Sequence, residues 1–158
     1  MKSIYSNKLI CNILDYIDDN LGAKITIEDL ENKFFYNRFY IMKLFKKELG
    51  IKIFDYINKV KINNSVLQIN NSNDLLIKVA IDNGFYSLEY FSEIFKREIG
   101  VSPKKFEKLM YNEYAYSDQI IHITQNIINI RKIINNTKKY RLNQKREISP
   151  RMSLSIFH

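Results

Sequence analysis

The sequence contains one cysteine, two prolines, four glycines and no tryptophan among its 158 residues. The single cysteine, Cys11, excludes an internal disulfide, argues against a thiolate metal site and fits a reducing compartment. We expect Cys11 to be a buried, inert thiol, because it shares a helical apolar register with Leu14. The scarcity of proline and glycine favours helices and argues against disordered or collagen-like structure.

Long apolar runs and catalytic groupings are also missing. No apolar stretch reaches the roughly 18 residues of a membrane helix, and the first one runs into Asp15, Asp18 and Asp19. We therefore expect neither a membrane span nor a cleaved signal. His122 and His158 lack a neighbouring ligand set, and there is no glycine-rich phosphate loop. We expect no enzyme activity, no metal and no cofactor.

Charge of one sign is in excess but unevenly placed. The chain has 25 Lys and Arg against 17 Asp and Glu, a net charge of +8. Residues 1–108 carry +3 of this and residues 109–158 carry +5. A basic balance fits a polyanionic partner such as nucleic acid. Because the first region is only mildly basic, the positions of its charges must support that interpretation.

What the chain does contain is an internal repeat. The segment Phe45–Ile51, FKKELGI, recurs fifty residues later as Phe95–Val101, FKREIGV. Upstream of both copies the same spacing pairs Tyr36-Asn37 with Tyr86-Ser87 and Tyr40 with Tyr90. Each copy reads as a short helix, a tight turn and a second helix that ends in a basic run and a glycine. This is the layout of a helix-turn-helix, whose second helix fits a DNA major groove.

Apolar periodicity and capping residues predict an all-α fold: two helix-turn-helix subdomains joined by a long connecting helix, with a C-terminal helical extension. We expect Thr26, Asn37, Ser87 and Ser102 to begin helices, and Gly50 and Gly100 to end them. The predicted helices cover residues 8–20, 27–34, 38–49, 53–69, 75–82, 88–99 and a short segment from Pro103.

These residues, in this order, resemble the DNA-binding domain of the AraC/XylS family of bacterial transcription regulators over about residues 8–110. The matching text includes Phe45 to Gly50, Ala80 to Phe85, Tyr90-Phe91-Ser92, Phe95-Lys96 and Gly100 to Pro103. The resemblance implies a cytoplasmic, sequence-specific regulator of transcription, an activator, with double-stranded DNA and RNA polymerase as partners. It also implies that helices 38–49 and 88–99 enter successive major-groove segments on one face of the duplex.

Carried onto this chain, the resemblance gives a set of DNA-binding residues. The groove-facing positions are Arg38, Phe39, Met42 and Lys43 in the first helix and Glu89, Tyr90 and Glu93 in the second. Ser92 is a further DNA-binding residue, while Lys46, Lys47, Lys96 and Arg97 face phosphates or flank them. The basic pairs in the last turn of each helix have an alternative interpretation, as solvated charges near the negative end of the helix dipole. Core anchors are expected at Phe45, Phe95, Leu49, Ile99, Tyr40 and Phe91.

Three residues depart from the family pattern: Glu31, Phe35 and Glu93. Phe35 stands where a turn glycine is usual, and since a bulky residue does not easily adopt positive φ, we expect the first turn to be built differently. Glu93 either accepts from cytosine N4 or pairs with Arg97, and we expect the ion pair. These departures leave open an alternative function, a degenerate helix-turn-helix that binds a protein with weak or no specific DNA binding.

We divide the chain into a double helix-turn-helix domain, 1–112, and an extension, 113–158. The extension begins with a helix of about 118–136, with Ser117 as its N-cap. Its isoleucine stripe either docks on the domain or mediates self-association; it comprises Ile120, Ile123, Ile127, Ile130 and Ile134. A basic stretch, 138–146, is predicted as a linker or an aid to non-specific DNA binding, and 152–156 alternates like a short strand.

Overall fold

The computed structural model describes residues 4–112 and 118–148, and within these ranges every regular element is an α-helix, as the sequence predicts. The elements are α1 (Ile4–Asp19), α2 (Ile27–Phe34), α3 (Arg38–Leu49), α4 (Ile53–Asn71), α5 (Leu76–Asp82), α6 (Leu88–Ile99), α7 (Pro103–Met110) and α8 (Asp118–Ile148). The expected N-cap Ser117 and the expected strand 152–156 lie outside the described residues. None of the described helices is long and apolar enough to cross a bilayer.

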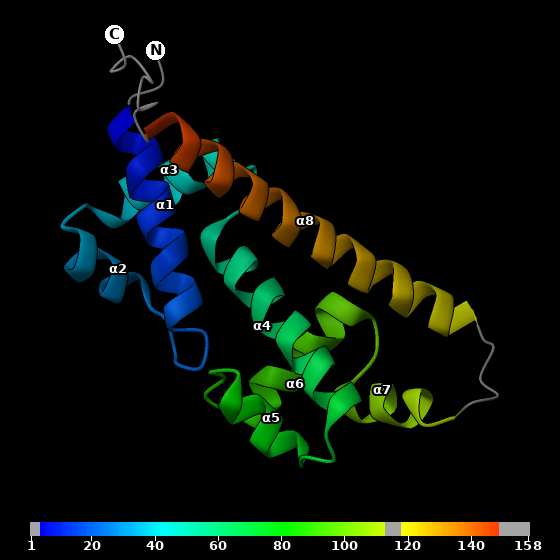
Figure 1. Cartoon of the computed structure of the whole chain (residues 1–158). Helices are drawn as coiled ribbons and strands as arrows, with labels where there is room; N and C mark the ends of the chain where they lie inside the picture. The colour runs from blue at the N-terminus through cyan, green and yellow to red at the C-terminus, as the bar shows by residue number, and fades with distance from the viewer. Residues whose placement is uncertain (1–3, 113–117, 149–158) are drawn as a thin grey trace, which may run out of the picture.

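Helix α4 is the connecting helix and lies at the centre of the molecule (Figure 1). Its 19 residues span about 28 Å at 1.5 Å per residue. Helices α1, α2 and α3 gather around one end of it, and α5, α6 and α7 gather around the other. The two repeats therefore occupy the two ends of one rigid element, and this element sets the distance between them.

Capping side chains begin the helices where the sequence places them. Thr26 and Asp29 form a reciprocal capping box at α2, with the Asp29 carboxylate accepting from the Thr26 N–H at 2.7 Å. Asn37 accepts from the Phe39 N–H at 2.9 Å to begin α3, and Ser87 accepts from the Tyr90 N–H at 3.1 Å to begin α6. Both second helices thus start from a satisfied N-terminus, which fixes their direction.

Each repeat has its own apolar contacts within one continuous core. In the first, the buried face of α1 packs against Phe45 of α3, whose ring lies 5.8 Å from that of Tyr56 on α4. In the second, Phe91, Phe95 and Phe106 form a chain of edge-to-face contacts at 5.6 and 5.5 Å. Such aromatic pairs contribute about 0.5–1.5 kcal/mol each beyond their buried area. The predicted anchors Phe45 and Phe95 are both completely buried.

Helix α8 is longer than expected, and its position decides how the isoleucine stripe is used. It runs on to Ile148 rather than ending near 136, so the basic stretch 138–146 is helical and not a linker. No proline or glycine occurs between residues 118 and 148 to stop the helix earlier. Its isoleucine stripe packs on α1, α4 and α6 of the same chain, with Ile123, Ile130 and Ile134 buried. Of the two alternatives for the stripe, docking on the domain is therefore the one that the structure shows. The division of the chain at residue 112 stays a prediction.

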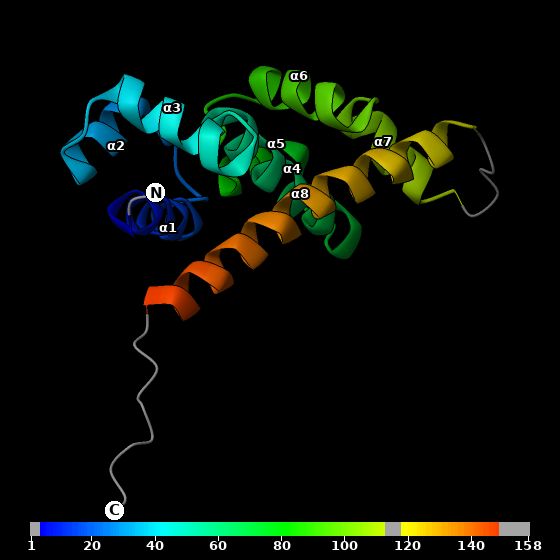
Figure 2. The same ribbon diagram turned by 90° about the horizontal axis from the view of Figure 1, so that it is seen from above.

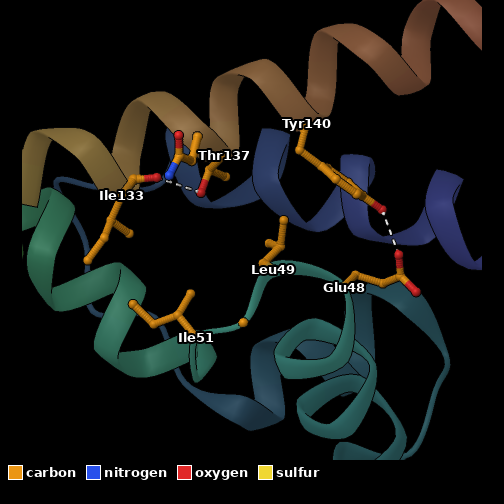
Figure 3. A pocket seen from close by; sticks show the side chains of 8 residues that line it. Glu48, Leu49, Ile51, Ile133, Thr137 and Tyr140 are labelled. Carbon is orange, nitrogen blue, oxygen red and sulfur yellow. Dashed lines mark hydrogen bonds between the residues drawn. The ribbon is translucent and has the colours of Figure 1, made fainter.

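Polar contacts secure the C-terminal half of α8. The Arg141 guanidinium contacts the carboxylates of Asp15 and Asp18 on α1 at 3.1 and 2.8 Å. The Tyr140 hydroxyl donates to Glu48 at 3.3 Å across a cavity of about 470 Å³ at the end of α3 (Figure 3). Burial and then the neighbouring Glu48 charge raise the pKa of Tyr140, which keeps the hydroxyl protonated as a donor. Helix α8 thus ties the first repeat to the centre of the molecule.

Candidate nucleic-acid interface

The turn between α2 and α3 is built differently from the expectation. Phe35 adopts a left-handed conformation, with φ of +58°, so the prediction that its bulk would prevent this is wrong. Its side chain is 91% exposed and meets no packing obstacle, so only the local cost of the conformation remains, about 1–2 kcal/mol. The Phe35 N–H donates to the Glu31 carbonyl at 2.8 Å and ends α2 as a glycine would.

Glu31 and Arg38 form a contact that the sequence did not reveal. One Glu31 carboxylate oxygen accepts from the Arg38 backbone N–H at 2.7 Å, and the other contacts the Arg38 guanidinium at 2.7 Å. Glu28 adds a second carboxylate at 3.2 Å. These acids raise the pKa of Arg38, whose guanidinium is held against α2. Glu31 thus fixes the start of α3, and Arg38 is a poorer candidate for DNA than its position suggested.

The rest of the outer face of α3 is accessible. Phe39 is 75% exposed and Met42 is 41% exposed, and the lysines that follow them are exposed as well. Within residues 4–112 and 118–148 no carboxylate pairs with Lys43, Lys46 or Lys47. The face therefore combines an apolar first half with a positively charged second half.

The outer face of α6 has a different chemistry. Glu89 and Glu93 are exposed, as are Lys96 and Arg97, while Tyr90 and Ser92 are half-buried. The expected Glu93–Arg97 ion pair is wrong, because Arg97 contacts Glu98 at 3.0 Å instead. An ion pair with Lys59 of the connecting helix holds the Glu98 carboxylate beside the Arg97 guanidinium. Glu93 is thereby left to face solvent.

Stacked tyrosines mark the start of both reading helices. The rings of Tyr36 and Tyr40 lie 5.3 Å apart with an interplanar angle of 23°, and those of Tyr86 and Tyr90 lie 4.6 Å apart at 18°. Tyr40 is 44% exposed, so its assignment to the core is wrong: stacking on the turn tyrosine holds it at the surface. Tyr36 and Tyr86 were missed as interface candidates. The signal was present in the repeat itself, which preserves both tyrosines at the same spacing.

Helices α3 and α6 lie on the same side of α4, and most of α8 runs along the other side (Figure 2). Their outer faces are not covered by any other described element. Two exposed helices therefore face one direction from the ends of a single connecting helix. This is the arrangement that two successive major-groove contacts on one duplex face require.

A buried lysine locks this arrangement. Lys61 of α4 is only 4% exposed, and its ammonium donates to the carbonyls of Ala23, in the first repeat, and Gly84, in the second, at 2.6 and 2.9 Å. Burial lowers the pKa of Lys61 to about 8. Gly84 has φ of +71°, and a Cβ there would lie 2.7 Å from the Leu21 carbonyl oxygen, so the close approach of the two repeats requires glycine.

Other site chemistries find little support. The described residues contain no group of three or more histidine, cysteine or acidic side chains that would hold a metal ion. Cys11 is buried, and burial followed by the nearby Asp15 charge raises its thiol pKa, as expected for an inert cysteine. The exposed faces of α3 and α6 are therefore the principal candidate site.

Comparison with known proteins agrees with this geometry. Residues 30–108, from α2 through α7, match the family described as a helix-turn-helix domain. Over 97 residues the chain is 30% identical to the multiple antibiotic resistance protein MarA of Escherichia coli, covering 61% of this chain and 76% of MarA. The chain belongs to the AraC/XylS-type helix-turn-helix family.

Two further relatives extend the match. The transcriptional activator AarP of Providencia stuartii is 23% identical over 117 residues, which cover 74% of this chain and 84% of AarP. The solved structure of a protein of unknown function from Listeria innocua is 30% identical, with a TM-score of 0.59 over 61% of this chain and 92% of that one. In this AraC/XylS-type chain both helix-turn-helix repeats are retained, and α8 follows the matched region.

Proposed function

We propose that this protein is a sequence-specific, double-stranded DNA-binding transcription regulator that acts as an activator. Membership of the AraC/XylS-type family supports this role, as do the relatives MarA and AarP, the second of which is named as a transcriptional activator. The observation that carries the proposal is the pair of uncovered helices, α3 and α6, on one side of α4. We propose a binding role without catalysis, in the cytoplasm, with RNA polymerase as a further partner.

The proposal assigns different tasks to the two helices. On α3, Phe39 and Met42 enter the groove, and Lys43 lies at its edge, where its ammonium reaches a phosphate. Lys46 and Lys47 contact phosphates as well. We assign Arg38 a structural role in this scheme, which is supported by the contacts of its guanidinium with Glu28 and Glu31. Base contacts specify a sequence, whereas phosphate contacts position the protein. We therefore assign most of the sequence discrimination of the first repeat to the start of α3.

On α6, the residues that face the groove are Glu89, Tyr90, Ser92 and Glu93. Lys96 and Arg97 both contact phosphates. Because Glu93 lacks the expected arginine partner, its carboxylate is available to accept from a cytosine N4 amino group. A carboxylate near DNA is tolerated only where it points at such a donor, since phosphates repel it. The second repeat therefore favours sites with a cytosine at the position that Glu93 faces.

The test is binding of the full chain to genomic fragments, measured by gel shift with excess non-specific DNA. Wild type should give a specific shift, and Lys43→Ala should weaken it by about tenfold if the lysine contacts a base or phosphate. Lys132→Ala, which removes an exposed charge from α8 outside the basic stretch 138–146, is the matched control and should bind like wild type. If wild type gives no specific shift, the alternative of a degenerate helix-turn-helix that binds a protein is favoured instead.

A further inference from the structure

The start of α3 offers few hydrogen-bonding groups to base edges. Asparagine and arginine are the side chains that most often make bidentate contacts with bases. Here the Asn37 side-chain oxygen caps the helix by accepting from the Phe39 N–H at 2.9 Å, and the Arg38 guanidinium is held by Glu28 and Glu31. The helix-turn-helix unit uses both groups for its own construction.

The side chains that project from the start of α3 are apolar instead. Phe39 and Met42 stand three residues apart and so share one face of the helix, and both are exposed. They line a concavity of about 390 Å³ whose floor is completed by Ile53 and Phe54 at the start of α4. Charged side chains complete the lining: Lys43, Lys46 and Lys52 contribute positive charge and Asp55 one negative charge, so the net charge is positive. An apolar surface with a net positive charge around it is complementary to the edge of a base pair that lies between phosphate strands.

Only one apolar group is displayed in the major groove of unmodified DNA, the C5 methyl of thymine. We propose that α3 reads its half-site by contact of Phe39 and Met42 with thymine methyl groups, so that the half-site facing α3 is specified by thymines rather than by guanines or adenines. This inference rests on the proposed DNA-binding function and names the chemistry that the first repeat recognises. Lys43 and Lys46 then hold the flanking phosphates and keep the helix in register.

Deoxyuridine substitution tests the inference, because uracil differs from thymine only by the methyl group. A binding site is first selected from random duplexes, and each thymine of the half-site facing α3 is then replaced singly by deoxyuridine. Affinity is measured by fluorescence anisotropy at constant salt. Loss of one buried methyl should weaken binding about fourfold. Substitution should weaken binding at one or more of the thymine positions, and at two of them if both Phe39 and Met42 contact a methyl group.

Protein variants then assign the effect to its residues. In Phe39→Ala or Met42→Ala the affinity for the thymine duplex should fall, and the thymine-to-uracil ratio should approach one at the corresponding position. Leu142→Ala removes an exposed apolar side chain from α8 and should keep the full ratio. Because Phe39 and Met42 are exposed, these variants should fold, and circular dichroism spectra should match that of wild type.

The outcomes separate the two proposals. If wild type selects no sequence at all, the regulatory function and the methyl contact both fail. If it selects a sequence but no deoxyuridine substitution weakens binding, the DNA-binding function stands and the methyl contact is overturned. The methyl contact is also overturned if Phe39→Ala and Met42→Ala both retain the wild-type thymine-to-uracil ratio.

Discussion

The two repeats approach each other closely at Gly84, and replacing this glycine with alanine should be far more damaging than the same change at Gly50. Both glycines are left-handed, with φ of +71° and +73°. A Cβ at Gly50 would meet nothing within 4 Å, whereas one at Gly84 would lie 2.6 Å from the Lys61 ammonium, 2.7 Å from the Leu21 carbonyl oxygen and closer still to that of Ala23. Comparing the two alanine variants therefore separates the cost of the left-handed backbone conformation, which both share, from the cost of steric overlap, which only Gly84→Ala incurs.

The magnitudes follow from these two effects. Left-handed strain alone should cost Gly50→Ala about 1–2 kcal/mol. Gly84→Ala adds the overpacking of backbone against backbone, about 1–3 kcal/mol. Displacement of the Lys61 ammonium from the Gly84 carbonyl adds about 1.5–3 kcal/mol for a lost charge-assisted hydrogen bond. The expected loss for Gly84→Ala is thus roughly 3.5–8 kcal/mol, a large part of the stability of a small domain.

Urea denaturation followed by circular dichroism measures both variants. An unchanged m-value would show that the folded and unfolded states keep their usual exposure, and the midpoint then reports stability. In DNA binding, Gly84→Ala should also lose specific affinity under conditions where it is folded, because α6 is displaced relative to α3, while Gly50→Ala should not. Equal destabilisation of the two variants, within about 1 kcal/mol, would refute the reasoning.

Three further predictions concern Lys61, Arg141 and Lys43. Burial lowers the pKa of Lys61 from 10.5 to about 8, so between these pH values the unfolded chain binds more protons and stability rises with pH, by up to about 3 kcal/mol. Lys61→Met should lack that rise when wild type and variant are denatured in parallel, and an identical pH dependence would contradict it. Arg141→Met should cost about 1–2 kcal/mol and speed amide exchange in α8, because Asp15 and Asp18 lose their partner; unchanged exchange would show that the apolar stripe suffices. With about five phosphate contacts, log K should fall with log salt at a slope of about −4 to −5, and Lys43→Ala should reduce its magnitude by about one. A slope near zero would count against phosphate contact.

Local signals made much of the fold predictable. Helix caps are set by residues a few positions apart, so Thr26 with Asp29, Asn37 and Ser87 could be identified directly. The left-handed stops at Gly50 and Gly100 followed from the conformational freedom of glycine, and these predictions are confirmed.

The candidate interface was less predictable because its side chains have competing partners. Positions on a helical face identified the exposed Phe39 and Met42, but periodicity does not reveal that Arg38 is engaged by acids from the preceding helix. Helical spacing also predicted an ion pair between Arg97 and Glu93. In the structure Arg97 pairs with Glu98 instead, and Lys59 of α4 holds the Glu98 carboxylate in place. The roles of these residues toward DNA stay predictions.

The sequence by itself determined the repeat, the capping residues and glycine stops within each unit and the family to which the chain belongs, since these depend on short-range spacing. Only the tertiary structure decided how the two units are fixed relative to each other. Lys61 joins carbonyls 38 and 23 positions away along the chain, and Arg141 reaches carboxylates 126 and 123 positions away. Contacts over such separations depend on where the folded helices bring the backbone, and apolar periodicity carries no information about that.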